Sequence, residues 1–321
     1  MAAVVEAKGD YTVNQDFEPR STSAPKRLAS SALRAASGGL HMVSRLLMSV
    51  ARPAHLYKAV CVDFKPRPDD IFIVSYPRSG TTWLQMILYQ LATDGDMNIP
   101  HISRRIPFFE NTIVFSPRAF DDLPSPRMFK SHLSYGWIPK GPYKYIYIAR
   151  NGKDVLVSNY HHERFGRAYT GTLSQFTDRF LQGRVQQGSW FKHVAEWYSH
   201  RNDKNVLFLT YEELSSDLEA SVKKIIEFCG FQVAPDRLPS ILNRCSFSFM
   251  KQHESKFSPA AEMELQRGIN REAFIRKGKV GGWKEYLDRR QEALFERKFQ
   301  GQLGKLGITF GAASESLPVE R

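Results

Sequence analysis

Residues 75–83, with the sequence SYPRSGTTW, have the composition of an anion-binding loop. Gly80 allows the backbone to approach an anion closely, and the free N–H groups of a helix that starts here point at it. Thr81 and Thr82 add hydroxyl donors, and Arg78 carries a permanently charged fork that can clamp an oxyanion. Such a loop suits a terminal 5′-phosphate-type group. The structural alternative is an ordinary helix start that Ser and Thr cap.

The loop lacks the Gly-Lys-Ser/Thr ending of ATP-binding and GTP-binding loops. A nucleoside triphosphate enzyme also needs a magnesium site with an acidic partner strand, whereas the later strands here end in Arg150 and Tyr211. We therefore expect no metal site, and a transferred group that carries less charge than a phosphoryl group. A sulfuryl group fits, because protein cations alone can neutralise it. A P-loop kinase is correspondingly disfavoured.

Two further basic segments could hold anions. Arg150 ends a strand in YIARNGKDVLVSNY, and Ser158 lies two turns into the next helix, so the two could grip a second phosphate. In FIRKGKVGGWK, Arg276, Lys277 and the backbone N–H of Gly278 form a compact anion-binding group. Taken alone, Arg-Lys-Gly is also a common surface turn.

The elements that must position these residues alternate along the chain. Apolar and β-branched runs predict strands, and helical patterns predict helices between them. The expected strands are 70–76, 127–132, 143–150 and 205–211, and the expected helical regions are 81–92, 152–165, 172–201 and 217–231. The fold class is therefore α/β, a central parallel sheet with helices on both faces and a P-loop-like binding loop. Ligands of such sheets bind at the carboxyl ends of the strands, where the loop lies.

Composition limits the partners and the compartment. The chain has 321 residues and a formal net charge of +12, yet it carries no signature of a nucleic-acid module and its basic residues are scattered. No apolar stretch reaches the ~18–20 residues that a membrane-spanning helix requires. The 3 cysteines, which have no disulfide or metal spacing, indicate a reducing compartment, so we expect a cytoplasmic location.

We expect two parts along the chain, a basic and flexible N-terminal extension at 1–55 and a folded domain at 56–321. The extension is rich in Ser, Ala and basic residues, which also fits a targeting peptide or a membrane-surface helix. Acidic residues at its very start argue against targeting, namely Glu6, Asp10 and Asp16. Near the other end, residues 250–275 are polar and weakly patterned, which predicts a loop or a lid.

Several segments taken together resemble the cytosolic sulfotransferase family. The matching segments, in order from about residue 56 onward, are YPRSGTTW, FKSHL, YIYIARNGKDVLVSNYHH, QGSWFKHVAEWY, VLFLTYEEL and FIRKGKVGGWK. The resemblance implies transfer of a sulfuryl group from 3′-phosphoadenosine 5′-phosphosulfate (PAPS) and release of adenosine 3′,5′-bisphosphate (PAP). It also implies a small-molecule acceptor, such as a phenol, sterol, alcohol or amine, and no nucleic-acid partner.

The resemblance assigns a role to each matching position. The loop would bind the phosphosulfate, Trp83 and Tyr211 would contact the adenine, and Arg150 and Ser158 would bind the 3′-phosphate. The implied nucleotide-binding residues are Arg78, Ser79, Gly80, Thr81, Thr82, Trp83, Arg150, Ser158, Tyr211, Cys245, Ser246, Phe247, Arg276, Lys277 and Gly278. The implied catalytic residues are His132 as base, Lys130 and Arg78, and the implied acceptor-binding residues are Phe108, Lys130, His132 and His162.

The chemistry of these residue types agrees with the implied roles. A hydroxyl acceptor loses its proton as it attacks sulfur, and a neutral imidazole with a pKa near ~6.5 can take that proton. Lys130 and Arg78 can stabilise charge that develops during transfer. Since a nucleotide phosphate is already a good leaving group, alignment and charge stabilisation should supply most of the catalysis. Without FKSHL around it, His132 would read as a polar residue at a strand end.

The chain departs from the family pattern at several positions. Arg78 stands where the family usually has Lys, which keeps the charge but excludes proton delivery. Gly282 replaces an acidic residue in a turn, and His162 replaces a common hydrophobic aromatic, which suits a more polar acceptor or a rearranged wall. Asp288 and Arg289 replace the usual Thr and Val of a dimerisation segment, so a homodimer is left open.

Two other classes of function remain as alternatives. A catalytically weak nucleotide-binding sensor or scaffold of the same fold is permitted by the change at Arg78. His132 and Lys130 argue against it, because a pure binding protein needs no base. A Golgi sulfotransferase would need an N-terminal membrane anchor and usually disulfides, and the sequence displays neither.

Overall fold

The computed structural model describes residues 58–115, 117–167, 169–258, 275 and 277–310. The expected extension at 1–55 lies outside the described residues, so the division into two parts stays a prediction. Arg276 and most of the expected loop or lid at 250–275 also lie outside them.

Four strands form one sheet in the order β2-β1-β3-β4, and every neighbouring pair is parallel. Their bounds are β1 Ile71–Val74, β2 Met128–Ser131, β3 Lys144–Ala149 and β4 Val206–Thr210. Each lies within an expected strand and is shorter by one or two residues at each end. Ile71 of the central strand pairs with Met128 on one side and with Lys144 on the other.

Helices connect and flank the strands. The described α-helices are α2 Thr81–Ala92, α3 Phe109–Phe115, α4 Gly152–Arg167, α5 Leu173–Leu181, α6 Trp190–Ser199, α7 Tyr211–Ser216, α8 Leu218–Cys229, α9 Leu238–Arg244, α10 Phe247–Gln252 and α12 Arg289–Gln302. The helical region expected at 172–201 is two helices, α5 and α6. Gly183 and Gly188 separate them with φ values of 70° and 69°, which a helix cannot contain.

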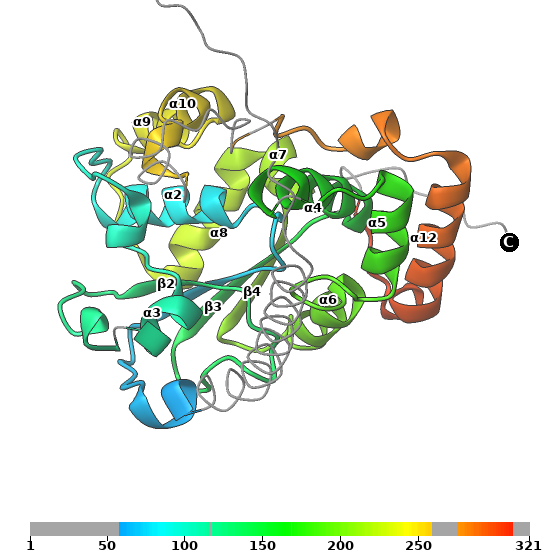
Figure 1. Cartoon of the computed structure of the whole chain (residues 1–321). Coiled ribbons are helices and arrows are strands. Elements are labelled where there is room, and N and C mark those ends of the chain that lie inside the picture. Colours follow the sequence, from blue (N-terminus) through cyan, green and yellow to red (C-terminus); the bar gives the residue numbers. More distant parts are fainter. Residues whose placement is uncertain (1–57, 116, 168, 259–274, 276, 311–321) are drawn as a thin grey trace, which may run out of the picture. The chain divides into compact units, whose positions relative to one another are not determined.

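Side chains alternate along β1 and divide the core into two layers. Ile71 and Ile73 point to one face, where they cluster with residues of α2 and α8. Phe72 and Val74 point to the other face, where an aromatic cluster includes Trp197 of α6. All four residues of β1 are buried, as is typical of a strand in a parallel sheet that is covered on both faces. The expected α/β architecture is therefore confirmed (Figure 1).

A third cluster joins the helices that lie beside the sheet. In Figure 1, α4, α5 and α12 lie next to one another, and Trp190 of α6 packs against Phe295 of α12 with ring centroids 5.8 Å apart. Asp288 caps α12, since its Oδ1 accepts from the Gln291 N–H at 2.8 Å and its own N–H donates to Gln291 at 2.9 Å. This cap gives Asp288 a local structural role at one of the positions where the chain departs from the family.

The strand order creates a switch point at β1, because the next two strands lie on opposite sides of it. Connections that leave in opposite directions open a crevice at the carboxyl ends of the strands. His132 follows β2, Arg150 follows β3 and Tyr211 follows β4, so the topology gathers these residues at the edge where the loop follows β1. None of the helices in the described segments combines the length and the apolar character needed to cross a bilayer.

Candidate active site

The loop after β1 has an unusual and tightly packed backbone. Arg78 and Gly80 have φ values of 71° and 104°, in the left-handed region that side chains rarely adopt. A Cβ atom on Gly80 would lie 2.8 Å from Cδ2 of Tyr211, so only glycine fits at this approach. The Arg78 guanidinium donates from Nε to Ser158 Oγ at 3.1 Å, and Arg150 donates to the Arg78 carbonyl at 3.4 Å. The loop thus contacts Ser158 and Arg150, the two residues that the sequence predicts to bind a second phosphate.

Two features of the loop fit an oxyanion. Ser79 is fully buried, and its Oγ has no hydrogen-bond partner among the described residues. An unpaired buried hydroxyl costs ~1–3 kcal/mol, which an anion at this position would recover by accepting its proton. Gly80 begins α2 without a side-chain cap, so the first N–H groups of this helix can also donate to an anion. Thr81, by contrast, hydrogen-bonds within the protein, to Ser75 Oγ at 2.5 Å.

Aromatic residues form a wall beside the loop. Trp83 and Tyr211 pack edge to face with ring centroids 5.3 Å apart. The Trp83 indole N–H donates to the Cys245 carbonyl at 2.7 Å, and the Tyr211 hydroxyl donates to the Gly278 carbonyl at 2.9 Å. The structure therefore brings together four of the predicted nucleotide-binding residues from four separate segments.

Phe247 and Gly278 complete this wall. Gly278 has a φ of 60°, and a Cβ atom there would collide with the Phe247 ring. Phe247 is 42% exposed, which is unusual for a large apolar residue. Ser246 has a structural role, because its Oγ accepts from the Phe249 N–H at 3.3 Å and caps α10.

Arg150 is oriented by its neighbours and retains an unused donor. Its guanidinium lies 4.1 Å above the Tyr211 ring and donates to the Lys279 carbonyl at 2.9 Å. Its Nε is buried without a hydrogen-bond partner in the described part of the chain. Glu212 fixes Asn151, the residue after Arg150, because its carboxylate accepts from the Asn151 N–H at 3.0 Å. Burial raises the pKa of this carboxyl above its usual value.

The segment after Arg276 is anchored by Asp154 of α4. The two carboxylate oxygens accept from Gly281 N–H at 2.8 Å and from Trp283 N–H at 2.9 Å. Lys277 lies at the surface and forms an ion pair with Glu285 at 2.6 Å. Within the described segment the backbone of Gly278 thus reaches the site, whereas the Lys277 ammonium is engaged by Glu285.

His132 presents one ring nitrogen as a base. Its Nδ1 lies 2.8 Å from the Ser75 carbonyl oxygen, which can only accept a hydrogen bond. In the neutral ring Nδ1 therefore carries the proton and Nε2 keeps its lone pair. The backbone N–H of His132 donates to Glu110 Oε1 at 2.5 Å. Phe108 packs edge to face on the ring at 5.3 Å, and Lys130 Nζ lies 5.2 Å from the Phe108 ring centroid.

Burial dominates the electrostatics of this group. It lowers the pKa of His132 well below 6.5, and the charge of Lys130 lowers it further, so the imidazole is neutral at pH 7. Burial also lowers the pKa of Lys130 to about 8, although the Glu110 carboxylate opposes the shift. Burial raises the pKa of Glu110 itself to about 7. The imidazole is thus in the form that a general base requires, and the pKa values of Lys130 and Glu110 lie near neutral pH.

Not every predicted residue is placed in the site by the described contacts. His162 is half-buried on α4, one turn after Ser158, and its part in an acceptor pocket stays a prediction. Thr82 is half-buried in the first turn of α2.

Sequence reasoning missed four residues that hold the site together, namely Ser75, Glu110, Asp154 and Glu212. Asp154 lies in the first turn of α4, where an acidic residue is already explained by its favourable interaction with the helix dipole. Glu110 is preceded by aromatic residues, and nothing in RIPFFE marks it as a partner of His132.

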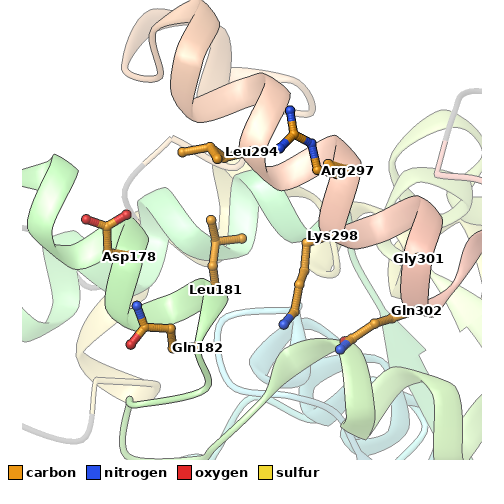
Figure 2. A pocket seen from close by; sticks show the side chains of 8 residues that line it. All are labelled: Asp178, Leu181, Gln182, Leu294, Arg297, Lys298, Gly301 and Gln302. Carbon is orange, nitrogen blue, oxygen red and sulfur yellow. The ribbon is translucent and has the colours of Figure 1, made fainter.

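A groove of about 430 Å³ lies between α5 and α12, and Figure 2 shows the side chains that line it. They are Asp178, Leu181, Gln182, Leu294, Arg297, Lys298, Gly301 and Gln302. None of them belongs to the candidate active site, so this groove adds nothing to the chemistry described above.

Comparison with known proteins gives consistent similarities. Residues 68–307 match the family model described as a sulfotransferase domain. Amine sulfotransferase from Oryctolagus cuniculus is 36% identical over 258 residues, which are 77% of this chain and 85% of the relative. Sulfotransferase 2B1 from Rattus norvegicus is 38% identical over 249 residues, 74% of this chain and 72% of the relative. A mouse sulfotransferase solved in complex with PAP covers 79% of this chain and 91% of its own, with 33% identity and a TM-score of 0.62.

Proposed function

Because the chain belongs to the sulfotransferase family, we propose that it transfers a sulfuryl group from PAPS to a hydroxyl or amine of a small acceptor. The mouse relative in complex with PAP supports this choice of donor. Ser79 Oγ and Arg150 Nε, which are buried without a partner among the described residues, support it independently, because each is available to donate to an anionic group.

Different residues of the chain would bind the three parts of the nucleotide. Arg78 and the N–H groups that begin α2 would hold the 5′ end, and Arg150 with Ser158 would hold the 3′-phosphate. Trp83 and Tyr211 would flank the adenine, whose flat apolar faces suit aromatic partners. When bound, PAPS supplies the sulfuryl group and a phosphate that leaves readily.

His132 would act as the general base. Its Nε2 takes the acceptor proton while the acceptor oxygen forms a bond to sulfur. The bond from sulfur to the 5′-phosphate oxygen breaks at the same time, and its electron pair leaves with PAP. The Ser75 carbonyl accepts from Nδ1–H and stabilises the imidazolium that results. Lys130 and Arg78 place positive charge beside the transferred group.

One observation carries this proposal, namely the 2.8 Å contact between His132 Nδ1 and the Ser75 carbonyl. Ser75 opens the loop that would hold the phosphosulfate, so the base is fixed to the same segment as the donor. A catalytically weak sensor has no need of this arrangement, which favours the enzyme over that alternative. We further propose that the enzyme acts in the cytoplasm, in line with the free thiols of Cys229 and Cys245.

Transfer of labelled sulfate from PAPS to a panel of phenols, sterols, aliphatic alcohols and amines tests the proposal. We expect a sulfated product and one equivalent of PAP with at least one class. Tight binding of PAP without any product across the panel would favour the sensor, and absence of PAP binding by folded protein would overturn the proposed function altogether.

A further inference from the structure

We propose that Glu110 is a positioning residue of this active site, which holds the backbone of His132 and supplies the negative counter-charge of Lys130. The inference rests on the proposed function, because it assigns a partner to the proposed base and to the cation beside it. Three independent features of the structure support it, namely the backbone pairing, the burial of the carboxylate and the charges around it.

The backbone places Glu110 next to the end of β2. Phe108 pairs with Lys130 as an isolated parallel bridge, and the Lys130 N–H donates to the Pro107 carbonyl at 2.9 Å. The segment that leads into α3 therefore runs alongside β2 in the same direction. Two residues beyond each partner lie Glu110 and His132, and the Glu110 carboxylate accepts the His132 N–H at 2.5 Å.

The burial of the carboxylate shows that more than a hydrogen bond is involved. Only Oε1 receives the His132 N–H, whereas Oε2 is buried without a hydrogen-bond partner in the described residues. A glutamine amide oxygen would accept the same N–H without the cost of burying a charge. The acid therefore contributes something that its shape alone does not, which is the negative charge that it carries above its pKa of about 7.

The negative charge of Glu110 acts on the protonation of Lys130. The charges of Glu110 on α3 and of Arg78 in the loop both act on Lys130, which the bridge to Phe108 holds two residues from Glu110. His132 is influenced by Lys130, Arg78 and His193, whose Nε2 lies 3.2 Å from the His132 carbonyl oxygen. Burial and Arg78 both favour the neutral amine of Lys130, and Glu110 acts in the opposite direction. Loss of the carboxylate charge would therefore lower the pKa of Lys130 from about 8 toward neutrality. The cation that stabilises the transferred group would then be lost within the working pH range.

The test compares the parent enzyme with Glu110→Gln and Glu110→Asp. The value of kcat/KM for an acceptor is measured from pH 5.5 to 9.5 at saturating PAPS. In Glu110→Gln the alkaline limb should move down by about 1 pH unit, the usual effect of one neighbouring charge. The rate loss relative to the parent should then be roughly fivefold larger at pH 8 than at pH 6. Glu110→Asp keeps the charge, so it should lose rate while its alkaline limb stays within about half a unit.

Glu219→Gln is the matched control, because Glu219 is exposed and pairs with Lys223 on α8. A purely structural role for Glu110 predicts an equal loss at every pH and an unmoved alkaline limb in Glu110→Gln. That result, or an alkaline limb in Glu110→Asp that moves by a full unit, would overturn the inference.

A second readout separates this inference from the proposed function. NMR titration of the Lys130 ε-ammonium in the PAP complex needs no turnover, and bound PAP also stabilises a weakened variant. The pKa of Lys130 should drop by about 1 unit in Glu110→Gln. An equal pKa in parent and variant would refute the role of Glu110 even if sulfate transfer is found. A drop in a protein that transfers no sulfate would refute the reaction and leave the electrostatic role in place.

Discussion

Nδ1 of His132 lies 2.8 Å from the carbonyl oxygen of Ser75, a residue 57 positions earlier in the chain. Because a carbonyl only accepts, this contact fixes the tautomer and directs the Nε2 lone pair away from β1. It also joins the end of β2 to the start of the anion-binding loop. The distance between the proposed base and the proposed donor-binding loop is therefore set by the sheet, in which β1 and β2 are neighbours.

Replacement of His132 tests the base. His132→Asn should lower kcat by about 10²- to 10⁴-fold, the usual contribution of a general base, and leave the Kd for PAP within about twofold. Steady-state assays and calorimetry measure the two quantities. His200→Asn is the control, because His200 is partly exposed and stacks on Tyr135 with ring centroids 3.4 Å apart. Comparable turnover of parent and His132→Asn would remove the residue from the mechanism.

Replacement of Arg150 tests the second anion site. A hydrogen bond to a charged group contributes ~1.5–3 kcal/mol, so Arg150→Ala should weaken PAP binding by roughly 10- to 150-fold. Adenosine 5′-phosphate, which lacks the 3′-phosphate, should bind parent and variant with similar affinity. Arg201→Ala is the control, since Arg201 lies at the surface over the Tyr198 ring at 4.0 Å. An unchanged Kd for PAP would exclude Arg150 from the site.

Replacement of Asp154 tests the anchor of the 277–283 segment. Asp154→Ala removes the acceptor of the Gly281 and Trp283 N–H groups, so hydrogen exchange at these amides should become faster. PAP affinity should fall severalfold, because the Gly278 backbone loses its fixed position. The exposed Asp178 on α5 provides the control Asp178→Ala, which should change neither quantity. Protected amides in Asp154→Ala would show that other contacts hold the segment.

The free energy of unfolding should decrease as the pH is lowered, because His193 is buried in its neutral form. This buried ring contacts the Tyr147 hydroxyl at 2.9 Å and the His132 carbonyl at 3.2 Å, and burial lowers its pKa to about 4. The unfolded chain binds the proton from about pH 6.5 downward, whereas the folded chain resists it until about pH 4. The free energy of unfolding should therefore drop by up to ~3 kcal/mol across this window.

Urea unfolding at pH 7, 5.5 and 4.5 measures this loss. His193→Gln cannot take up the proton, so its stability should be lower at pH 7 but should decline less steeply between pH 7 and 4.5. Parallel curves for parent and variant would assign the acid sensitivity to other groups, of which His132 is the first candidate.

The strands and the loop could be predicted because their signals are local. A buried parallel strand is a short apolar run, and all four appear as such in the sequence, while their ends were placed one or two residues too far out. The split between α5 and α6 was missed because Gly183 and Gly188 lie in a segment that otherwise has helical patterning. Candidate catalytic residues could be proposed because each lies inside one recognisable segment, such as FKSHL for Lys130 and His132.

The sequence by itself therefore determined the family, the parallel α/β class and the residues that carry charge or a proton. Only the tertiary structure decided which groups orient them. Glu110 meets His132 across 22 residues, Tyr211 meets Gly278 across 67, and Asp154 meets Gly281 across 127. Local periodicity specifies which face of an element is apolar, but it carries no information about which distant polar groups will meet. The order of the strands, with the switch point at β1, brings these pairs together.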